Sequence, residues 1–105
     1  MKKIDLAAAL SEKPFFRVIE STPRGQVAVM CLEKGQESGP GLDAHPTQDQ
    51  WLYVLEGEGI VRTGGGETKI GPGDLYLIPS GEPHQVIGAS EAPLRTIDFY
   101  SPPAY

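Results

Sequence analysis

The sequence predicts an all-β fold, arranged as a sandwich or small barrel of short strands. Turn-forming residues are frequent, with 13 glycines and 10 prolines among the 105 residues. The runs between these turns are short and favour strands, because they are rich in β-branched and aromatic residues. They recur about every ten residues, which is the spacing typical of sandwiches and barrels. A chain of this length is expected to form one domain, residues 1–105, with one modest core.

The elements can be assigned in chain order. Residues 4–10 favour a short N-terminal helical turn that ends before Pro14. A long loop at residues 33–42 contains three glycines and is expected to arch over one end of the sandwich. Pro102 and Pro103 predict a tail that frays or packs on a partner subunit. We expect about nine short strands, of which the clearest are residues 15–20, 26–32, 50–55, 59–63, 67–70, 74–78, 84–89 and 94–100.

Charge and composition exclude several classes of function. The formal net charge of −5 gives no basic face of the kind that nucleic acid requires. No apolar run approaches the ~20 residues that span a bilayer, and Asp5 interrupts the apolar segment after the N-terminal lysines, so no signal peptide is expected. Cys31 is the lone cysteine, which fits a reducing compartment. We therefore expect a cytoplasmic protein whose partner is a small molecule.

Residues 73–84, with the sequence GDLYLIPSGEPH, form the most informative stretch of the chain. Pro79 has a fixed φ and Gly81 tolerates a positive φ, so the chain can reverse sharply between two strands. Pro83 biases the residue before it towards an extended backbone. His84 then opens the next strand, and the alternation of a strand places His84 and Val86 on the same face.

The spacing in this stretch, G-x5-P-x-G-x2-H, resembles the second signature motif of the cupins. That motif usually ends with Asn four residues after the histidine, where this chain has Gly88. Residues 43–57, with the sequence DAHPTQDQWLYVLEG, resemble the first cupin motif, H-x-H-x3-4-E-x6-G. The resemblance covers roughly residues 35–100, with both motifs in order. It implies a double-stranded β-helix, or jelly-roll barrel.

The resemblance also implies a divalent metal inside the barrel. Most cupins hold it with two histidines and a glutamate of the first motif and with the histidine of the second. Counting back from Gly57, the x6 spacing aligns Gln50 with the glutamate. A four-residue spacer then aligns His45 with the second histidine and Asp43 with the first, while His84 fills the last position. The implied metal ligands are therefore Asp43, His45, Gln50 and His84.

Two outcomes remain open for this altered ligand set. Two histidines and a carboxylate with open positions suit Fe(II) and other divalent transition metals, such as Mn, Zn or Ni. Alternatively, the metal is lost and the same polar side chains hydrogen-bond to one another. An alternative register aligns His45 with the first histidine and Thr47 with the second, but it shortens the spacer to two residues. The chain contains only two histidines, and both align with ligand positions, which favours metal binding.

Three functions are open. The first is a metal-dependent enzyme that acts on a small molecule, with dioxygenase-like or isomerase-like chemistry. The second is a non-catalytic module that binds a small ligand or a metal through a degenerate site, and the third is an oligomerisation partner whose site has decayed. The fold alone cannot choose, because one scaffold hosts many chemistries. The apolar side chains expected to line the barrel and contact the substrate are Leu52, Val54, Val86, Ile97 and Phe99.

The strand at residues 50–55 has a second apolar face. Trp51, Tyr53 and Leu55 alternate with Gln50, Leu52 and Val54, so they point away from the barrel interior. Such a face is expected to serve in sheet packing or as a dimer surface. We therefore expect a homodimer, because a small sandwich with an apolar outer face commonly buries it against a second copy.

Overall fold

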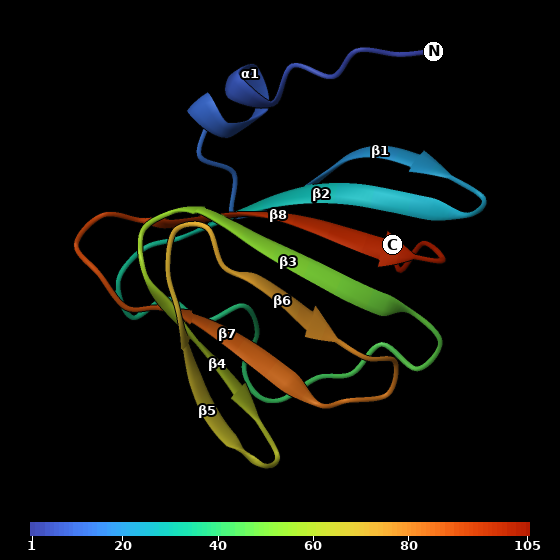
Figure 1. Cartoon of the computed structure of the whole chain (residues 1–105). Helices are drawn as coiled ribbons and strands as arrows, with labels where there is room; N and C mark the ends of the chain where they lie inside the picture. The colour runs from blue at the N-terminus through green and yellow to red at the C-terminus, as the bar shows by residue number, and fades with distance from the viewer.

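The protein folds into two β-sheets that face each other, with a short helix on the outer side of the larger sheet (Figure 1). The computed structural model describes residues 1–105. The all-β prediction is confirmed, with eight strands where about nine were expected. No helix of the structure is long and apolar enough to cross a membrane. The elements are α1 (Leu6–Ser11), β1 (Phe16–Thr22), β2 (Gly25–Leu32), β3 (Asp49–Glu56), β4 (Gly59–Thr63), β5 (Gly66–Ile70), β6 (Leu75–Ile78), β7 (His84–Gly88) and β8 (Leu94–Ser101).

The strands pair in the crossed order of a jelly roll. The five-stranded sheet has the order β1-β2-β8-β3-β6, and the three-stranded sheet has the order β5-β4-β7. The last strand, β8, therefore lies between β2 and β3, as the red arrow between the cyan and green ones shows in Figure 1. All these pairs are antiparallel. This topology brings the first and second motifs to facing sheets, because β3 lies within the first motif and β7 begins at the histidine of the second.

The segment of residues 34–43 runs alongside β7 instead of arching over one end of the sandwich. It forms isolated bridges that join Lys34 to Gly88 and Asp43 to His84. Gly88 allows this close approach, since a Cβ atom there would lie 2.3 Å from the carbonyl oxygen of Glu33. The motif usually has Asn at this position, and the close approach of Glu33 explains why this chain has a glycine there.

The hydrophobic core lies between the two sheets. The alternation in β3 is regular, so that Leu52 and Val54 are fully buried while Trp51 and Tyr53 are exposed on the outer face. The two faces of this strand are therefore as the sequence predicted. The eight residues of the core cluster are Met30, Leu32, Leu52, Val54, Val61, Ile70, Val86 and Leu94.

The prediction that Ile97 and Phe99 line the barrel was wrong. Phe99 is 45% exposed and pairs with Trp51 on the outer face of the large sheet. The side chains of β8 that point inward include Thr96 and Asp98, which are buried. Apolar residues occur on both faces of this strand, so the alternation in the sequence could not show which face points into the barrel. The pairing of β8 with β2 on one side and β3 on the other determines its orientation.

Candidate functional site

The barrel contains a cavity of about 580 Å³, a size typical of small-molecule sites. Both motifs contribute to its wall, together with the segment of residues 38–43 and the inner face of β8. The four metal ligands implied by the resemblance all line this cavity. The complete lining is Phe15, Phe16, Met30, Ser38, Gly39, Pro40, Gly41, Leu42, Asp43, His45, Gln50, His84, Val86, Asp98, Tyr100 and Tyr105.

The structure brings the two histidines together. Their ring centroids are 5.5 Å apart, although the residues come from different motifs. The backbone of His84 pairs with that of Asp43 through two hydrogen bonds of 2.7 and 2.9 Å. His45 is held nearby, because its carbonyl oxygen accepts a hydrogen bond of 2.7 Å from the Gly81 amide. The turn between β6 and β7 therefore positions both imidazoles at once.

The hydrogen bonds of His84 leave one ring nitrogen free. Nδ1 lies 3.0 Å from the carbonyl oxygen of Glu82. A carbonyl oxygen can only accept, so Nδ1 carries the hydrogen of this bond, and in the neutral form of the ring Nε2 is the nitrogen with the lone pair. Metal-binding histidines are commonly oriented in this way by a second hydrogen bond. His84 is only 8% exposed, so its free nitrogen is of use mainly to a group inside the cavity.

The environment of His45 favours a neutral imidazole. Its pKa is lowered from the usual value, mainly by burial and secondly by repulsion from His84. The carboxylate of Asp43 acts in the opposite direction but does not reverse the shift. A neutral ring has a nitrogen lone pair available to a metal or a hydrogen-bond donor.

Gln50 places an unpartnered acceptor in the cavity wall. The side chain is 3% exposed, and its Nε2 donates to Oδ2 of Asp98 over 3.4 Å. Its Oε1 is buried and has no hydrogen-bond partner. A buried acceptor left in this state costs roughly 1–3 kcal/mol. The position therefore suits a bound group that donates a hydrogen bond to Oε1, or a metal ion that Oε1 coordinates.

Asp98 is a buried acid that sequence analysis missed. It is 1% exposed, and Thr96 donates a hydrogen bond of 2.8 Å to its Oδ1. Burial raises its pKa to about 7, against the hydrogen bonds of Thr96, Gln50 and Tyr100, which lower it. The available signal was an acidic residue between Ile97 and Phe99 in the middle of a strand, on the same face as Tyr100.

Aromatic rings form a wall beside the histidines, and they too were missed. The ring of His45 lies 5.2 Å from that of Tyr100 and 5.6 Å from that of Tyr105. Phe16 adds a further ring 4.8 Å from Tyr105. Burial is the main cause that raises the pKa of both tyrosines, so the two phenols stay protonated at neutral pH.

The tail after β8 folds back on its own chain, so the expectation that it frays was wrong, whereas its packing on a partner subunit stays a prediction. The side-chain amide of Gln26 donates 2.7 Å to the carbonyl oxygen of Tyr105, and its Oε1 accepts from the amides of Ala104 and Tyr105. Gln48 donates to the carbonyl oxygen of Pro103. These contacts place Tyr105 in the cavity wall. No local sequence pattern could reveal them, because they join residues 55 to 79 positions apart.

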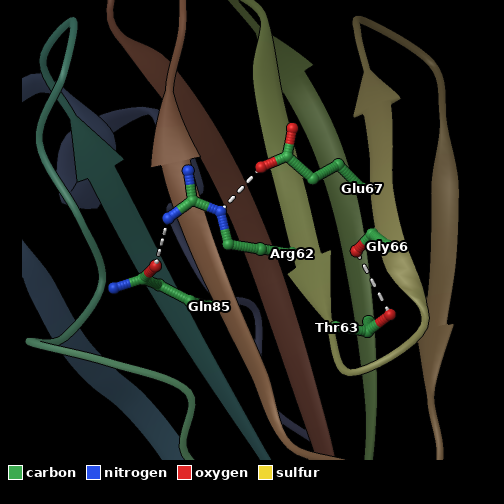
Figure 2. A network of polar contacts seen from close by, with 5 residues as sticks. All are labelled: Arg62, Thr63, Gly66, Glu67 and Gln85. Carbon is green, nitrogen blue, oxygen red and sulfur yellow. Dashed lines mark hydrogen bonds and ion pairs between the residues drawn. The ribbon is translucent and has the colours of Figure 1, made fainter.

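A second polar network supports the part of the cavity wall that contains Gly39. Arg62 donates from Nε to Glu67 over 2.7 Å and from Nη1 to Gln85 over 3.3 Å (Figure 2). Gln85 in turn donates 2.6 Å to the carbonyl oxygen of Gly39. Since Gly39 belongs to the cavity-lining segment of residues 38–42, this network fixes the position of that wall.

The donors that the geometry offers to a metal can now be compared with the implied set. No group of three or more His, Cys, Asp or Glu side chains lies close enough to hold a metal ion. Asp43 is exposed, and its carboxylate accepts a hydrogen bond from the Ala44 amide. Of the implied ligands, the rings of His45 and His84 have centroids 5.5 Å apart, and the side-chain oxygen of Gln50 is buried without a hydrogen-bond partner. Two imidazoles and an amide oxygen suit a divalent transition metal bound with open positions.

The five apolar residues predicted to contact substrate divide into three groups. Val86 lines the cavity as expected. Leu52 and Val54 are fully buried in the core and do not reach it. Ile97 and Phe99 belong to the other face of the sheet.

Solved structures share this architecture over most of the chain. BH2720 from Bacillus halodurans is 27% identical, with a TM-score of 0.89 over 99% of this chain and 83% of that one. TT1209 from Thermus thermophilus is 28% identical, with a TM-score of 0.81 over 97% of this chain and 98% of that one. KdgF from Halomonas sp. is 25% identical, with a TM-score of 0.73 over 84% of this chain and 77% of that one.

Sequence comparison gives the same family. YrkC of Bacillus subtilis is 32% identical over 84 residues, which cover 74% of this chain and 44% of that protein. TcmJ of Streptomyces glaucescens is 30% identical over 58 residues, which cover 55% of this chain and 39% of that protein. The chain thus spans less than half the length of these two curated relatives. The sequence model of the cupin domain matches residues 28–100, and with the jelly-roll topology and both motifs in place, the chain belongs to the cupin family.

Proposed function

We propose that this protein binds a divalent transition metal inside its barrel and acts on a small molecule bound beside it. One observation carries the proposal. Two imidazoles from different motifs lie with their ring centroids 5.5 Å apart in a cavity, whose lining also includes Gln50 with a buried side-chain oxygen that has no partner. Polar groups arranged in this way are costly to fold unless they bind something.

The proposed ligands are His45, His84 and Gln50, with Asp43 as a further donor at the exposed side. The carbonyl oxygen of Glu82 orients the ring of His84 so that Nε2 remains available. When bound, a divalent metal supplies Lewis-acid chemistry or oxygen activation. The proposed reaction is therefore of dioxygenase or isomerase type.

The remaining cavity surface would bind the organic part of the substrate. The rings of Phe16, Tyr100 and Tyr105 form a largely apolar wall beside the histidines. Such a wall excludes water and packs against flat or apolar groups. One curated relative, TcmJ, is named as a tetracenomycin polyketide synthase protein, which is consistent with a small organic substrate. We propose that the protein acts in the cytoplasm, where its lone buried thiol, Cys31, would stay reduced.

Elemental analysis of purified protein tests the metal site. We expect about one divalent transition metal per chain, and a loss of metal affinity of at least about tenfold in His45→Ala and in His84→Ala. Thr47→Ala is the matched control, because Thr47 is a ligand only in the alternative register and does not line the cavity. Metal-loaded protein that keeps its metal after both histidine substitutions would contradict the proposed ligands.

A second candidate function is a non-catalytic module that binds a small ligand without metal. It is favoured by the finding that no three acidic, thiol or imidazole side chains converge on one point. The histidines, Gln50 and Asp98 would then hydrogen-bond directly to the ligand. Saturable binding of a small molecule by protein that takes up no metal after supplementation, with no turnover, would support this function over the first.

A further inference from the structure

The side-chain amide of Gln50 is hydrogen-bonded at one end only. Its Nε2 donates to Oδ2 of Asp98 over 3.4 Å. The other end, Oε1, is buried and has no hydrogen-bond partner. The partner at the bonded end therefore determines which atom of this amide is left free.

Asp98 reaches Gln50 from the neighbouring strand. The strands β3 and β8 lie side by side in the five-stranded sheet (Figure 1). In their register Gln50 pairs with Tyr100, and Leu52 pairs with Asp98. Gln50 and Asp98 are thus diagonal neighbours, a spacing that long side chains can bridge. Both residues line the cavity, although Asp98 belongs to neither motif.

The carboxyl group of Asp98 is itself fixed in place. Thr96 donates a hydrogen bond of 2.8 Å to Oδ1. Thr96 is fully buried and Asp98 is 1% exposed, so water does not compete for this contact. Because Oδ1 is already bonded to Thr96, Oδ2 is the oxygen that is presented to Gln50.

A carboxylate determines the orientation of an amide beside it. An ionised carboxylate only accepts hydrogen bonds, whereas an amide has a donor end and an acceptor end. Asp98 therefore selects the Nε2 end of Gln50 and leaves Oε1 free. This choice matters for an ion, because an amide oxygen can coordinate a cation and the amide NH2 group can only donate hydrogen bonds.

We infer that Asp98 is a positioning residue of the proposed metal site, which holds the amide of Gln50 so that Oε1 stays available to the ion. Asp98 also supplies, from β8, a negative charge of the kind that the first motif usually supplies from the position of Gln50. The inference rests on the proposed function, because it names the residue that orients one of the proposed ligands.

The Zn²⁺ affinity of Asp98→Asn at pH 8 tests this role. The carboxyl group of the wild type is mostly ionised there, since its pKa is about 7. Thr96 would still donate to the oxygen of the introduced amide, so the NH2 group of that amide would face Gln50. The amide of Gln50 then turns over to accept a hydrogen bond, and Oε1 is lost to the ion. We expect the affinity, measured by competition with a chelator, to fall about 10–100-fold.

Glu58→Gln is the matched control, because it neutralises an exposed carboxylate that does not line the cavity, and its Zn²⁺ affinity should equal that of the wild type. A wild type that binds no Zn²⁺ would overturn the proposed function, and this inference with it. If the wild type binds Zn²⁺ and His84→Ala weakens the binding, an undiminished affinity in Asp98→Asn would overturn the inference alone.

A second substitution separates orientation from a merely structural effect. Gln50→Glu has an oxygen at both ends of the side-chain group, so no partner needs to orient it. In the Asp98→Asn background it should restore Zn²⁺ affinity at least to the wild-type value, with the total charge conserved. In the wild-type background the new carboxylate would face Asp98, and repulsion should make the gain smaller. Equal gains in the two backgrounds would show that the two side chains act independently, and would overturn the inference.

Circular dichroism shows whether each variant folds. If Asp98→Asn does not fold, Thr96→Val replaces it, because this variant keeps the carboxylate of Asp98 and removes the hydrogen bond that fixes it. We expect a smaller loss of Zn²⁺ affinity in Thr96→Val than in Asp98→Asn. A folded Thr96→Val variant with the affinity of the wild type would equally contradict the inference.

Discussion

Asp98 shows how a single buried residue can carry a stability cost inside a functional cavity. Its carboxyl group is 1% exposed, with Thr96 and Gln50 as its hydrogen-bond partners. Burial raises its pKa from 3.8 to about 7. In the unfolded chain the same group would ionise near pH ~3.9. Between these values the folded protein holds a proton that the unfolded chain has lost.

The pH dependence of stability follows from this difference. Because the pKa of Asp98 is raised in the folded protein, the contribution of this residue to the free energy of unfolding is most favourable below about pH 4. The contribution declines as the pH rises towards 7 and is constant above pH 7. At ~1.4 kcal/mol per pKa unit, the full change is on the order of 4 kcal/mol. Asp98→Asn should therefore stabilise the metal-free protein by a few kcal/mol at pH 8, with the gain nearly absent at pH 4.

Urea denaturation at the two pH values measures this gain. Glu58→Gln is the control, because it neutralises an exposed carboxylate that forms no ion pair. It should change stability little at either pH. An equal effect of Asp98→Asn at pH 4 and pH 8 would mean that ionisation of this residue is not the cause.

At the scale of elements, the contact between β7 and the segment of residues 34–43 depends on Gly88. A Cβ atom at this position would lie 2.3 Å from the carbonyl oxygen of Glu33 and 2.8 Å from that of Leu32. Both are backbone atoms, so the segment could not move aside without losing its hydrogen bonds to β7. This contact also holds Asp43 opposite His84, and it therefore supports the cavity wall.

Gly88→Ala should destabilise the protein by roughly 1–3 kcal/mol, the usual cost of forcing extra atoms into a packed site. Gly71→Ala is the matched control. Its Cβ would have no atom within 4 Å and its φ is not positive, so the same substitution should be neutral or slightly stabilising. The midpoints of chemical denaturation compare the two variants. Equal midpoints would show that the segment yields to the added methyl group.

At the scale of the whole molecule, the proposed metal would join the two sheets. His45 lies just before β3 of the large sheet, and His84 is the first residue of β7 in the small one. An ion held by both rings would bind the folded state and not the unfolded chain. Such binding stabilises by about 2.7 kcal/mol when the free metal is at a hundred times its dissociation constant.

We therefore expect the Tm to rise by about 10–20 °C when a divalent transition metal is added at that excess to chelator-treated protein, since about 1 kcal/mol shifts a domain of this size by ~4–8 °C. Thermal denaturation with and without metal measures the shift. Thr47→Ala should show the same rise as the wild type, while His84→Ala should show a clearly smaller one. An undiminished rise in His84→Ala would place the metal elsewhere in the molecule.

Much of this protein follows from its sequence alone. The glycines and prolines between short strand-forming runs determine an all-β fold, because they set where strands can begin and end. The turn around Pro79 and Gly81 orients His84, because these residues restrict the backbone conformation over a few positions. The spacing of the two motifs placed both histidines at the cavity, as the structure shows. These are local constraints, and local constraints can be read along the chain.

Only the tertiary structure decided the rest of the cavity. Asp98 faces inward and Phe99 outward although both faces of β8 contain apolar residues, because the neighbours β2 and β3 set its orientation. Tyr105 reached the cavity through hydrogen bonds to Gln26, far away in the sequence. Burial, and with it the raised pKa of Asp98, depends on what packs around a side chain. That packing is a property of strands brought together from distant parts of the chain, which no local pattern encodes.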